Sequence, residues 1–244
     1  MPEATLRVCA LYPELMNIYA DRGNLLLLER RCRWRSLGFQ LDASDLGQPL
    51  DPGAADLFYI GGGQDRDQER CAYDLVEFKR AGLEAAAARG AVILGVCGGY
   101  QLLGHSYELG DETLPGLGLV DARTVREDGP RLIGNVAIEV ELTPGLRRIL
   151  AGFENHGGRT YLGPASHALG RVLKGHGNNG RDGYEGVREG TIIGTYLHGP
   201  LLPKNVWLAD WLIETALGLE QTLTPLDDGL EEAAHLEARR AAGL

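Results

Sequence analysis

One cysteine of the sequence stands where a nucleophile would. The segment AVILGVCGGYQLLG, residues 91 to 104, runs from an apolar stretch into Cys97, two glycines and an expected helix. A sharp strand-to-helix turn strains its corner residue, and Gly95, Gly98 and Gly99 remove Cβ atoms that would collide there. A cysteine at a helix N-terminus is also biased towards thiolate. The pattern predicts that Cys97 is a nucleophile and that the N–H of Gly98 faces a developing oxyanion.

A second glycine-rich segment follows another apolar stretch. In DLFYIGGGQDRD, residues 56 to 67, three consecutive glycines that include Gly62 and Gly63 come directly after an expected strand. Such a loop could cradle a phosphate or supply backbone N–H donors to an oxyanion. Because the segment has neither the Lys-Ser/Thr ending of a P-loop nor the spacing of a dinucleotide fingerprint, we favour the oxyanion loop.

A histidine follows a third apolar stretch. In GTYLHGP, residues 194 to 200, His198 comes just past an expected buried strand, and it is the only one of the six histidines in such a place. A histidine at a strand end is often a hydrogen-bonded structural residue. A cysteine nucleophile, however, needs a base within hydrogen-bond reach, so the presence of Cys97 favours His198 as that base. The other cysteines, Cys9, Cys32 and Cys71, lack glycine-rich surroundings and are expected to be inert.

The elements that carry these residues predict a layered α/β fold. Residues 6 to 11, 56 to 60 and 91 to 96 have the composition of short buried strands, and helices are expected from about residue 24 to Gly38 and over 67 to 89. Strands that alternate with helices of this length form a doubly wound, mostly parallel, flavodoxin-like sheet flanked by helices. The carboxyl ends of such strands gather a site at one edge of the sheet.

The second half of the sequence changes rhythm. From about Gly116, alternating segments such as VAIEVEL and glycine-rich turns predict an antiparallel portion. Residues 191 to 197 are expected to form one more buried strand, and 203 to 217 an amphipathic helix. We expect one domain over residues 1–219 and a charged helical tail over 220–244 that is loosely attached or reserved for a partner.

Composition narrows the classes of partner and compartment. The 244 residues are 44% hydrophobic and carry a formal net charge of -10, so a nucleic-acid partner is not expected. The four cysteines have no short paired spacing, which disfavours a disulfide framework or a metal site. The N-terminus does not have a basic segment followed by an apolar run, and no apolar run is long enough for a membrane-spanning helix. The sequence therefore predicts a cytoplasmic protein that does not insert into a membrane.

At these motifs the sequence resembles class I glutamine amidotransferases, whose elbow is commonly G-x-C-x-G. The longer reading through Tyr100 and Gln101 resembles the cobyric acid synthase type, and it is most similar to the glutaminase subunits of lipid II isoglutaminyl synthases. The resemblance runs from about Val8 to Leu219. It includes five further stretches, at residues 19–24, 61–65, 131–135, 153–158 and 196–200.

The resemblance implies a glutaminase that releases ammonia from L-glutamine through a thioester. The family's nucleophile falls on Cys97, its histidine on His198, and its glutamine-contacting arginine on Arg131, whose guanidinium could grip an α-carboxylate with two hydrogen bonds. Further glutamine contacts are expected at Gly62, Gly63, Gly98 and Gln101, and no metal site is expected. Residues 154–158 are expected to form a turn that shapes the same pocket, with Asn155 and His156 structural.

The resemblance also implies a partner. That partner would be a Mur-ligase-like, MurT-type synthetase subunit that uses ATP and magnesium to amidate the D-glutamate of the lipid II stem peptide to D-isoglutamine. Because this chain has no P-loop, we expect no cofactor in it. Three alternatives remain: a cobyrinate-type glutaminase, a stand-alone thiol hydrolase or peptidase, and a non-catalytic binding module.

One residue departs from the wider class. Many class I members read His-x-Glu, in which the acid orients the histidine, but Pro200 occupies that place here, as in the cobyric acid synthase type. A proline cannot orient an imidazole. We therefore hypothesise that a carboxylate of the partner subunit approaches His198 and completes the site in the complex.

Overall fold

A six-stranded sheet forms the centre of the molecule. The computed structural model describes residues 4–17, 22–219 and 222–244. The strand order is β13-β14-β4-β3-β1-β2, and all neighbours are parallel except β13 and β14. The strands are β1 (Thr5–Leu11), β2 (Gly38–Ser44), β3 (Leu57–Ile60), β4 (Val92–Val96), β13 (Val187–Glu189) and β14 (Ile192–Thr195). Strands β3, β4 and β14 are buried along their whole length.

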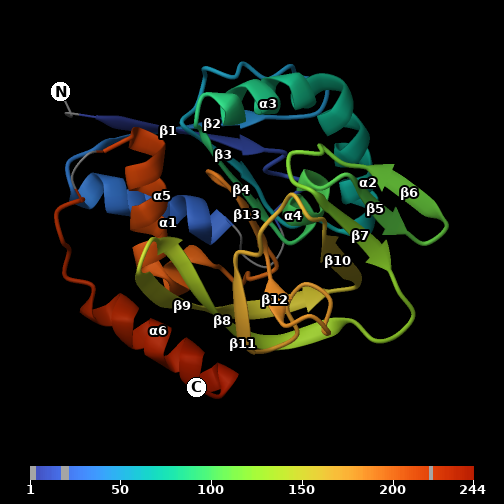
Figure 1. Ribbon diagram of the computed structural model, residues 1–244. Helices are drawn as coiled ribbons and strands as arrows, with labels where there is room; N and C mark the ends of the chain where they lie inside the picture. The colour runs from blue at the N-terminus through green and yellow to red at the C-terminus, as the bar shows by residue number, and fades with distance from the viewer. Residues whose placement is uncertain (1–3, 18–21, 220–221) are drawn as a thin grey trace.

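Helices cover both faces of this sheet, which confirms the expected doubly wound α/β fold (Figure 1). Helices α1 (Arg22–Trp34) and α5 (Val206–Leu217) pack against each other on one face. The other face carries α2 (Asp65–Asp74), a π-helical turn η1 (Leu75–Lys79) and α3 (Arg80–Ala88). The short helix α4 (Gly98–Leu103) follows β4. No helix within the described residues is long and apolar enough to cross a membrane.

The differences from the expectations include two helix boundaries and one strand. The first helix ends at Trp34, because Ser36 takes a left-handed conformation (φ 59°) before the chain turns. Strand β2 was not expected, since it is a mostly exposed edge strand without an apolar run. The last expected helix begins at Val206, because Pro203 lies in a separate 3-10 turn, η2 (Leu202–Lys204).

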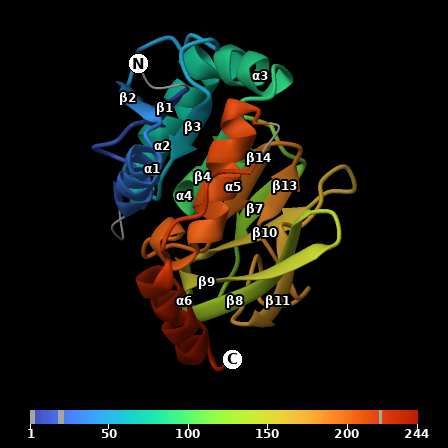
Figure 2. The ribbon, with the colours of Figure 1, turned by 90° about the vertical axis from the view of Figure 1, so that its left-hand side faces the viewer.

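Two further sheets form the second half of the fold and confirm the expected antiparallel portion (Figure 2). Only β5 and β7 pair in parallel within them. One sheet has the order β10-β7-β5-β6 and contains β5 (Ser106–Leu109), β6 (Glu112–Pro115), β7 (Ala122–Arg126) and β10 (Gly158–Leu162). The other has the order β12-β11-β8-β9 and contains β8 (Leu132–Thr143), β9 (Leu146–His156), β11 (Gly170–Lys174) and β12 (Tyr184–Glu185).

The C-terminal tail is helical, and it packs against the rest of the chain. Helix α6 (Gly229–Ala242) contacts β8, β9 and η2. The side chain of Asn135 donates to the carbonyl of Ala241 (3.0 Å), and His235 Nδ1 lies 2.8 Å from the carbonyl of Lys204. A division of the chain at residue 219 stays a prediction.

A buried arginine joins the tail to the central domain. The side chain of Arg31, on α1, is fully buried and pairs with Asp210 of α5 (2.5 Å) and with Asp228 (2.7 Å), the residue before α6. Arg35 also pairs with Asp210 (2.8 Å). A buried guanidinium is tolerated only when its donors are satisfied, so this cluster fixes where the tail begins.

We expect Arg31→Met to destabilise the protein by about 2–3 kcal/mol in urea unfolding, because removing one member of a buried ion pair leaves the other uncompensated. The loss should stay below that of a fully buried pair, since the two aspartates are 21% and 22% exposed and Arg35 remains. The control is Arg33→Met on the same helix, an exposed arginine paired with Glu29, which should cost at most about 0.5 kcal/mol. Equal losses in the two variants would contradict the prediction.

Candidate active site

Cys97 stands at a strained corner between β4 and α4. Its backbone has φ 53° and ψ −107°, a left-handed conformation that residues with a Cβ rarely adopt. Two backbone hydrogen bonds hold this corner. The N–H of Cys97 donates to the carbonyl of Thr195 at the end of β14 (2.8 Å), and the N–H of Gln101 donates to the Cys97 carbonyl (3.1 Å). The thiol-bearing residue is 7% exposed. This is the geometry of the expected nucleophile elbow.

The glycine loop after β3 lies directly against this elbow. The N–H of Gly99 donates to the carbonyl of Gly61 (3.0 Å), and a Cβ on Gly98 would lie 3.1 Å from the backbone N of Gly63. Gly62, between Gly61 and Gly63 in this loop, is also buried. The structure therefore brings the expected oxyanion donors of loop and elbow side by side, and their role in stabilising an oxyanion stays a prediction.

The other three cysteines are placed as inert core residues. Cys9, Cys32 and Cys71 are all buried thiols. Burial raises the pKa of Cys9 to about 11 and that of Cys32 and Cys71 to about 12, so these thiols stay protonated at neutral pH. None of the three stands at a positive-φ corner.

His198 follows strand β14, which is the direct neighbour of the elbow strand β4 in the sheet. The register pairs Thr195 with Val96, so both chains continue past the sheet at the same edge, one into Cys97 and the other into His198. The backbone of His198 is fixed by two hydrogen bonds to Phe153 of β9, of 3.0 and 3.1 Å, and its ring packs edge-on against the Phe153 ring. The side chain is fully buried.

Burial makes His198 a neutral imidazole. Its pKa falls from 6.5 to about 4, first because burial penalises the charged ring and then because His156, Lys204 and Arg131 oppose a further positive charge. A neutral imidazole can accept a proton from a thiol, which is what a general base requires.

This shift predicts the acid limb of glutamine hydrolysis. If His198 is the base, kcat/KM should stay level from pH of about 7 down to about 5 and fall only towards pH 4, where the imidazole takes its proton. The free energy of unfolding also falls as the pH drops from 6.5 to about 4, since the unfolded chain binds this proton from pH 6.5 downwards. Circular dichroism must therefore show that the protein is still folded at each pH. An acid limb centred near pH 6.5 would contradict the prediction.

Arg131 is exposed and is held by Asn155 of strand β9. Its Nε donates to the side-chain oxygen of Asn155 (2.8 Å) and one Nη2 hydrogen goes to the Asn155 carbonyl (2.8 Å). A guanidinium has five N–H groups, so the outer pair formed by Nη1 and Nη2 retains donors for a carboxylate. Asn155, which holds Arg131, lies two residues after Phe153, which fixes His198, so β9 carries the supports of both residues.

Residues 154–158 do not form the turn that the sequence predicted. Residues 153–156 end strand β9, and only Gly157 separates them from β10, because β9 pairs with β8 as far as the Leu132–His156 pair. This continuous strand lets Phe153 fix His198 and Asn155 hold Arg131. It also stacks the His156 ring on that of Tyr196, with centroids 3.6 Å apart. The segment therefore organises much of the candidate site.

The side chain of Gln101 is part of a buried polar network. Its amide oxygen accepts a hydrogen bond from Gln68 (2.7 Å), and its amide nitrogen donates to the hydroxyl of Tyr196 (3.1 Å). The Tyr196 hydroxyl also contacts Thr160 Oγ1 (2.6 Å). A direct glutamine contact by Gln101 stays a prediction. Gln68, which supports the elbow from α2, was not singled out from sequence because its role depends on tertiary contact.

A second buried amide joins the His198 loop to the sheet. Asn24 of α1 donates to the hydroxyl of Tyr59 (2.9 Å) and accepts from the N–H of Leu202 (2.8 Å). Next to it, a Cβ on Gly23 would lie 2.9 Å from the ring of Pro200. Two motifs of the family resemblance thus touch each other. Residues 19–21 of the first motif lie outside the described residues.

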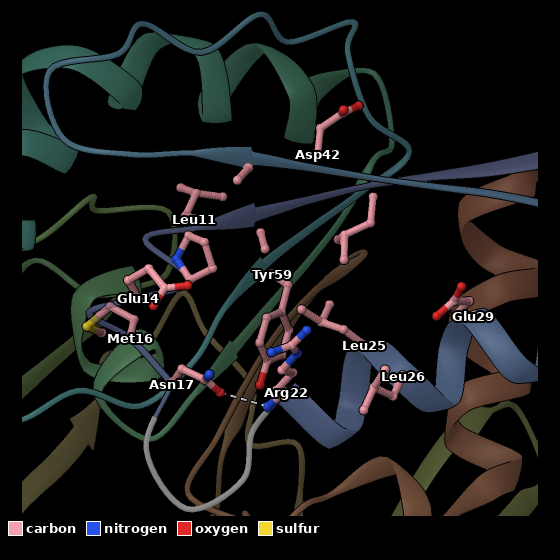
Figure 3. A pocket seen from close by; sticks show the side chains of 14 residues that line it. Leu11, Glu14, Met16, Asn17, Arg22, Leu25, Leu26, Glu29, Asp42 and Tyr59 are labelled. Carbon is pink, nitrogen blue, oxygen red and sulfur yellow. Dashed lines mark hydrogen bonds between the residues drawn. The ribbon is translucent and has the colours of Figure 1, made fainter.

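A cavity of about 350 Å³ opens behind the glycine loop, between β1, β2 and α1 (Figure 3). Its walls include Leu11, Leu25 and Tyr59, with Arg22 and Glu29 at the rim, and none of the expected site residues is among its described lining residues. Met16 lies between the two regions, since it lines the cavity and would contact a Cβ on Gly63 (3.3 Å to Met16 Cε). The cavity is therefore separate from Cys97. The described part of the chain contains no cluster of His, Cys, Asp or Glu that could hold a metal ion.

The chain is similar in sequence to two groups of known proteins. It is 40% identical to the GatD subunit of the glutamine-hydrolysing lipid II isoglutaminyl synthase of Staphylococcus aureus, over 82% of this chain and 80% of that protein. It is 37% identical to the GatD subunit of Streptococcus pneumoniae, over 87% and 80%. It is 33% identical to a cobyric acid synthase of Pelotomaculum thermopropionicum, over 81% of this chain but only 38% of that longer protein.

Solved structures share the fold. A chain in the structure of PurLQS from Thermotoga maritima matches with a TM-score of 0.59 at 20% identity, over 95% of this chain and 98% of that one. A glutamine amidotransferase of the same organism matches with a TM-score of 0.52 at 18% identity, over 98% and 94%. The CobB/CobQ-like glutamine amidotransferase domain matches residues 7–206. The chain therefore belongs to the CobB/CobQ-like glutamine amidotransferase family, in the group that contains the GatD subunits.

Proposed function

We propose that this chain is the glutamine-hydrolysing subunit of a lipid II isoglutaminyl synthase. The observation that carries the proposal is the strained Cys97 corner, whose N–H is bonded to the strand that leads into His198. The length of the match supports the lipid II assignment over the cobyrinate alternative, because the chain spans 80% of the GatD relatives and 38% of a cobyric acid synthase.

In the proposed reaction the Cys97 sulfur attacks the side-chain carbonyl carbon of glutamine while neutral His198 takes the thiol proton. The carbonyl oxygen becomes an oxyanion beside the backbone N–H groups of Gly98 and Gly63. When the intermediate collapses, the C–N bond breaks and His198 returns its proton to the leaving nitrogen, which departs as ammonia. A water then hydrolyses the glutamyl thioester, releasing glutamate and restoring the thiol.

In this proposal Arg131 binds the α-carboxylate of glutamine through its outer Nη1–Nη2 edge. We expect Arg131→Ala to weaken the use of glutamine by about 1.5–3 kcal/mol, the range for a hydrogen bond to a charged group. The measurement is kcat/KM for glutamine hydrolysis, with Arg147→Ala, an exposed arginine of β9 paired with Glu139, as the control. An unchanged kcat/KM would place Arg131 outside the glutamine site.

The remaining parts of the synthase belong to a partner. The proposed partner is a Mur-ligase-like, MurT-type subunit that binds ATP and magnesium, amidates the D-glutamate of lipid II and works with this chain in the cytoplasm. This chain lacks the Lys-Ser/Thr ending of a P-loop in its glycine-rich segments, which supports nucleotide binding in the other subunit. The relatives named GatD are each a subunit of a synthase.

The test is to co-express the chain with a Mur-ligase-like, MurT-type subunit from the same organism and to supply the complex with ATP, lipid II and either glutamine or ammonium. Formation of amidated lipid II from glutamine, detected by mass spectrometry, would support the proposal. Amidation of a cobyrinate acceptor instead would favour the cobyrinate alternative, and hydrolysis of glutamine-containing peptides by the chain alone would favour a peptidase. Either result would overturn the lipid II assignment.

A further inference from the structure

A pair of opposite charges lies beside the elbow and has no part in the mechanism above. Asp65 is the first residue of α2, directly after the glycine loop, and Arg126 is the last residue of β7. Arg126 Nη1 and Asp65 Oδ2 are 3.8 Å apart, and the two side chains are 40% and 56% exposed respectively. An exposed pair of this length contributes little to stability, so both groups keep hydrogen-bonding capacity for a ligand.

Tyr107 connects this pair to the candidate site. Its buried side chain on β5 lies beside Gly158 of β10, and Gly158 pairs with Arg126 of β7. Burial raises the pKa of Tyr107, and the charges of Asp65 and Cys97 add to that rise. A Cβ on Gly158 would lie 3.4 Å from the Tyr107 ring and 2.6 Å from the side-chain nitrogen of Gln101. The pair therefore lies near Gln101, on the helix that begins at the Cys97 corner.

Arg126 also lies beside the expected carboxylate-binding arginine. A Cβ on Gly157 would be 3.1 Å from Arg126 Nη1 and 3.4 Å from Arg131 Nη1. Gly157 thus leaves room for both guanidinium groups to approach one point. Two cations converge there, and a carboxylate stands next to one of them at 3.8 Å.

Free glutamine carries a matching pair of charges on one carbon, an α-carboxylate and an α-ammonium. A glutamine residue inside a peptide carries neither. We propose that Asp65 binds the α-ammonium of glutamine and that Arg126, together with Arg131, binds its α-carboxylate. This inference rests on the proposed function and deepens it, because it explains how the site selects the free amino acid over a peptide.

The test compares two diazo ketones that alkylate a glutaminase cysteine. One is 6-diazo-5-oxo-L-norleucine, which carries both α-groups of glutamine, and the other is 6-diazo-5-oxohexanoate, which lacks the α-ammonium. Intact-mass spectrometry gives the rate of labelling at Cys97 for each reagent. We expect the wild-type chain, in its complex with the synthase subunit, to react with the first about 10- to 100-fold faster, as expected for one hydrogen bond between charged groups. The ratio cancels any loss of folded protein.

In Asp65→Asn this preference should fall to within about twofold of unity. The matched control is Asp67→Asn, which removes another acidic side chain from the same first turn of α2 and should keep the preference. Arg126→Gln should slow labelling by both reagents alike, since both carry the carboxylate. A preference that persists in Asp65→Asn, or that is absent from the wild type, would overturn the inference alone. Absence of any labelling at Cys97 in the wild type would overturn the proposed function as well.

Discussion

Replacement of Cys97 by alanine is expected to abolish ammonia release from glutamine while the fold remains intact. Alanine has no nucleophilic atom, so no thioester can form, and the remaining binding groups cannot supply the missing bond. Stability should not fall, because Cys97 has the only strained backbone of the elbow and alanine occupies less space in it. The measurement is glutamate formation by the complex, together with urea unfolding of the isolated chain.

The same variant separates glutamine hydrolysis from amidation. The complex with Cys97→Ala should still amidate its acceptor when ammonium replaces glutamine, because the synthetase chemistry belongs to the partner. Cys71→Ala is the control, since that thiol is fully buried in the core with a raised pKa and should leave glutamine-dependent amidation unchanged. Residual glutaminase activity near the wild-type level would show that another group is the nucleophile.

The second large effect is expected at Gly99. A Cβ at this position would lie 2.8 Å from the carbonyl carbon of Ile60, 2.9 Å from the carbonyl oxygen of Gly61, and closer still to the Ile60 oxygen. These are all backbone atoms at the end of β3 and the start of the glycine loop, so Gly99→Ala must push that segment away from the elbow. We expect a loss of about 1–3 kcal/mol in stability from overpacking. We also expect glutaminase activity to fall about 100-fold, the effect of misplacing site groups by about 1 Å.

The control for this substitution is Gly134→Ala. A Cβ at Gly134, on β8, would meet nothing within 4 Å, and its backbone is not among the positive-φ glycines. Urea unfolding and glutamine hydrolysis should therefore stay close to wild type in that variant. If Gly99→Ala behaved like Gly134→Ala in both measurements, the contact between loop and elbow would not matter for the site.

The parts of the site that could be predicted from sequence are those set by short-range pattern. An apolar strand, a cysteine and two glycines specify the elbow within one local segment, and an apolar strand followed by His198 specifies the second group. Because β4 and β14 are parallel neighbours, local placement at two strand ends was enough to bring them together. The same reasoning gave the buried strands of the central sheet.

The contacts that could not be predicted from sequence depend on the pairing of elements that are far apart in the chain. The support of Arg131 by Asn155 follows from the pairing of β8 with β9, and an alternating pattern such as VAIEVEL indicates a strand but not its partner. Strand β2 was not predicted because this mostly exposed edge strand has no apolar run. The links from Gln68 and Asn24 to the site join elements more than 30 residues apart, and no local signal marks them.

The close approach of Gly23 to Pro200 has a consequence for comparing homologues. A Cβ at position 23 would overlap the proline ring, at 2.9 Å from its Cγ and 3.1 Å from its Cβ, so a larger residue at position 23 does not fit while Pro200 stays as it is. We expect the two to covary: a homologue with alanine or serine at position 23 should carry a smaller residue than proline at position 200. In a double-mutant cycle, Gly23→Ala and Pro200→Ala should accordingly be non-additive. An alignment could thus locate the histidine loop from a residue at the start of the first helix.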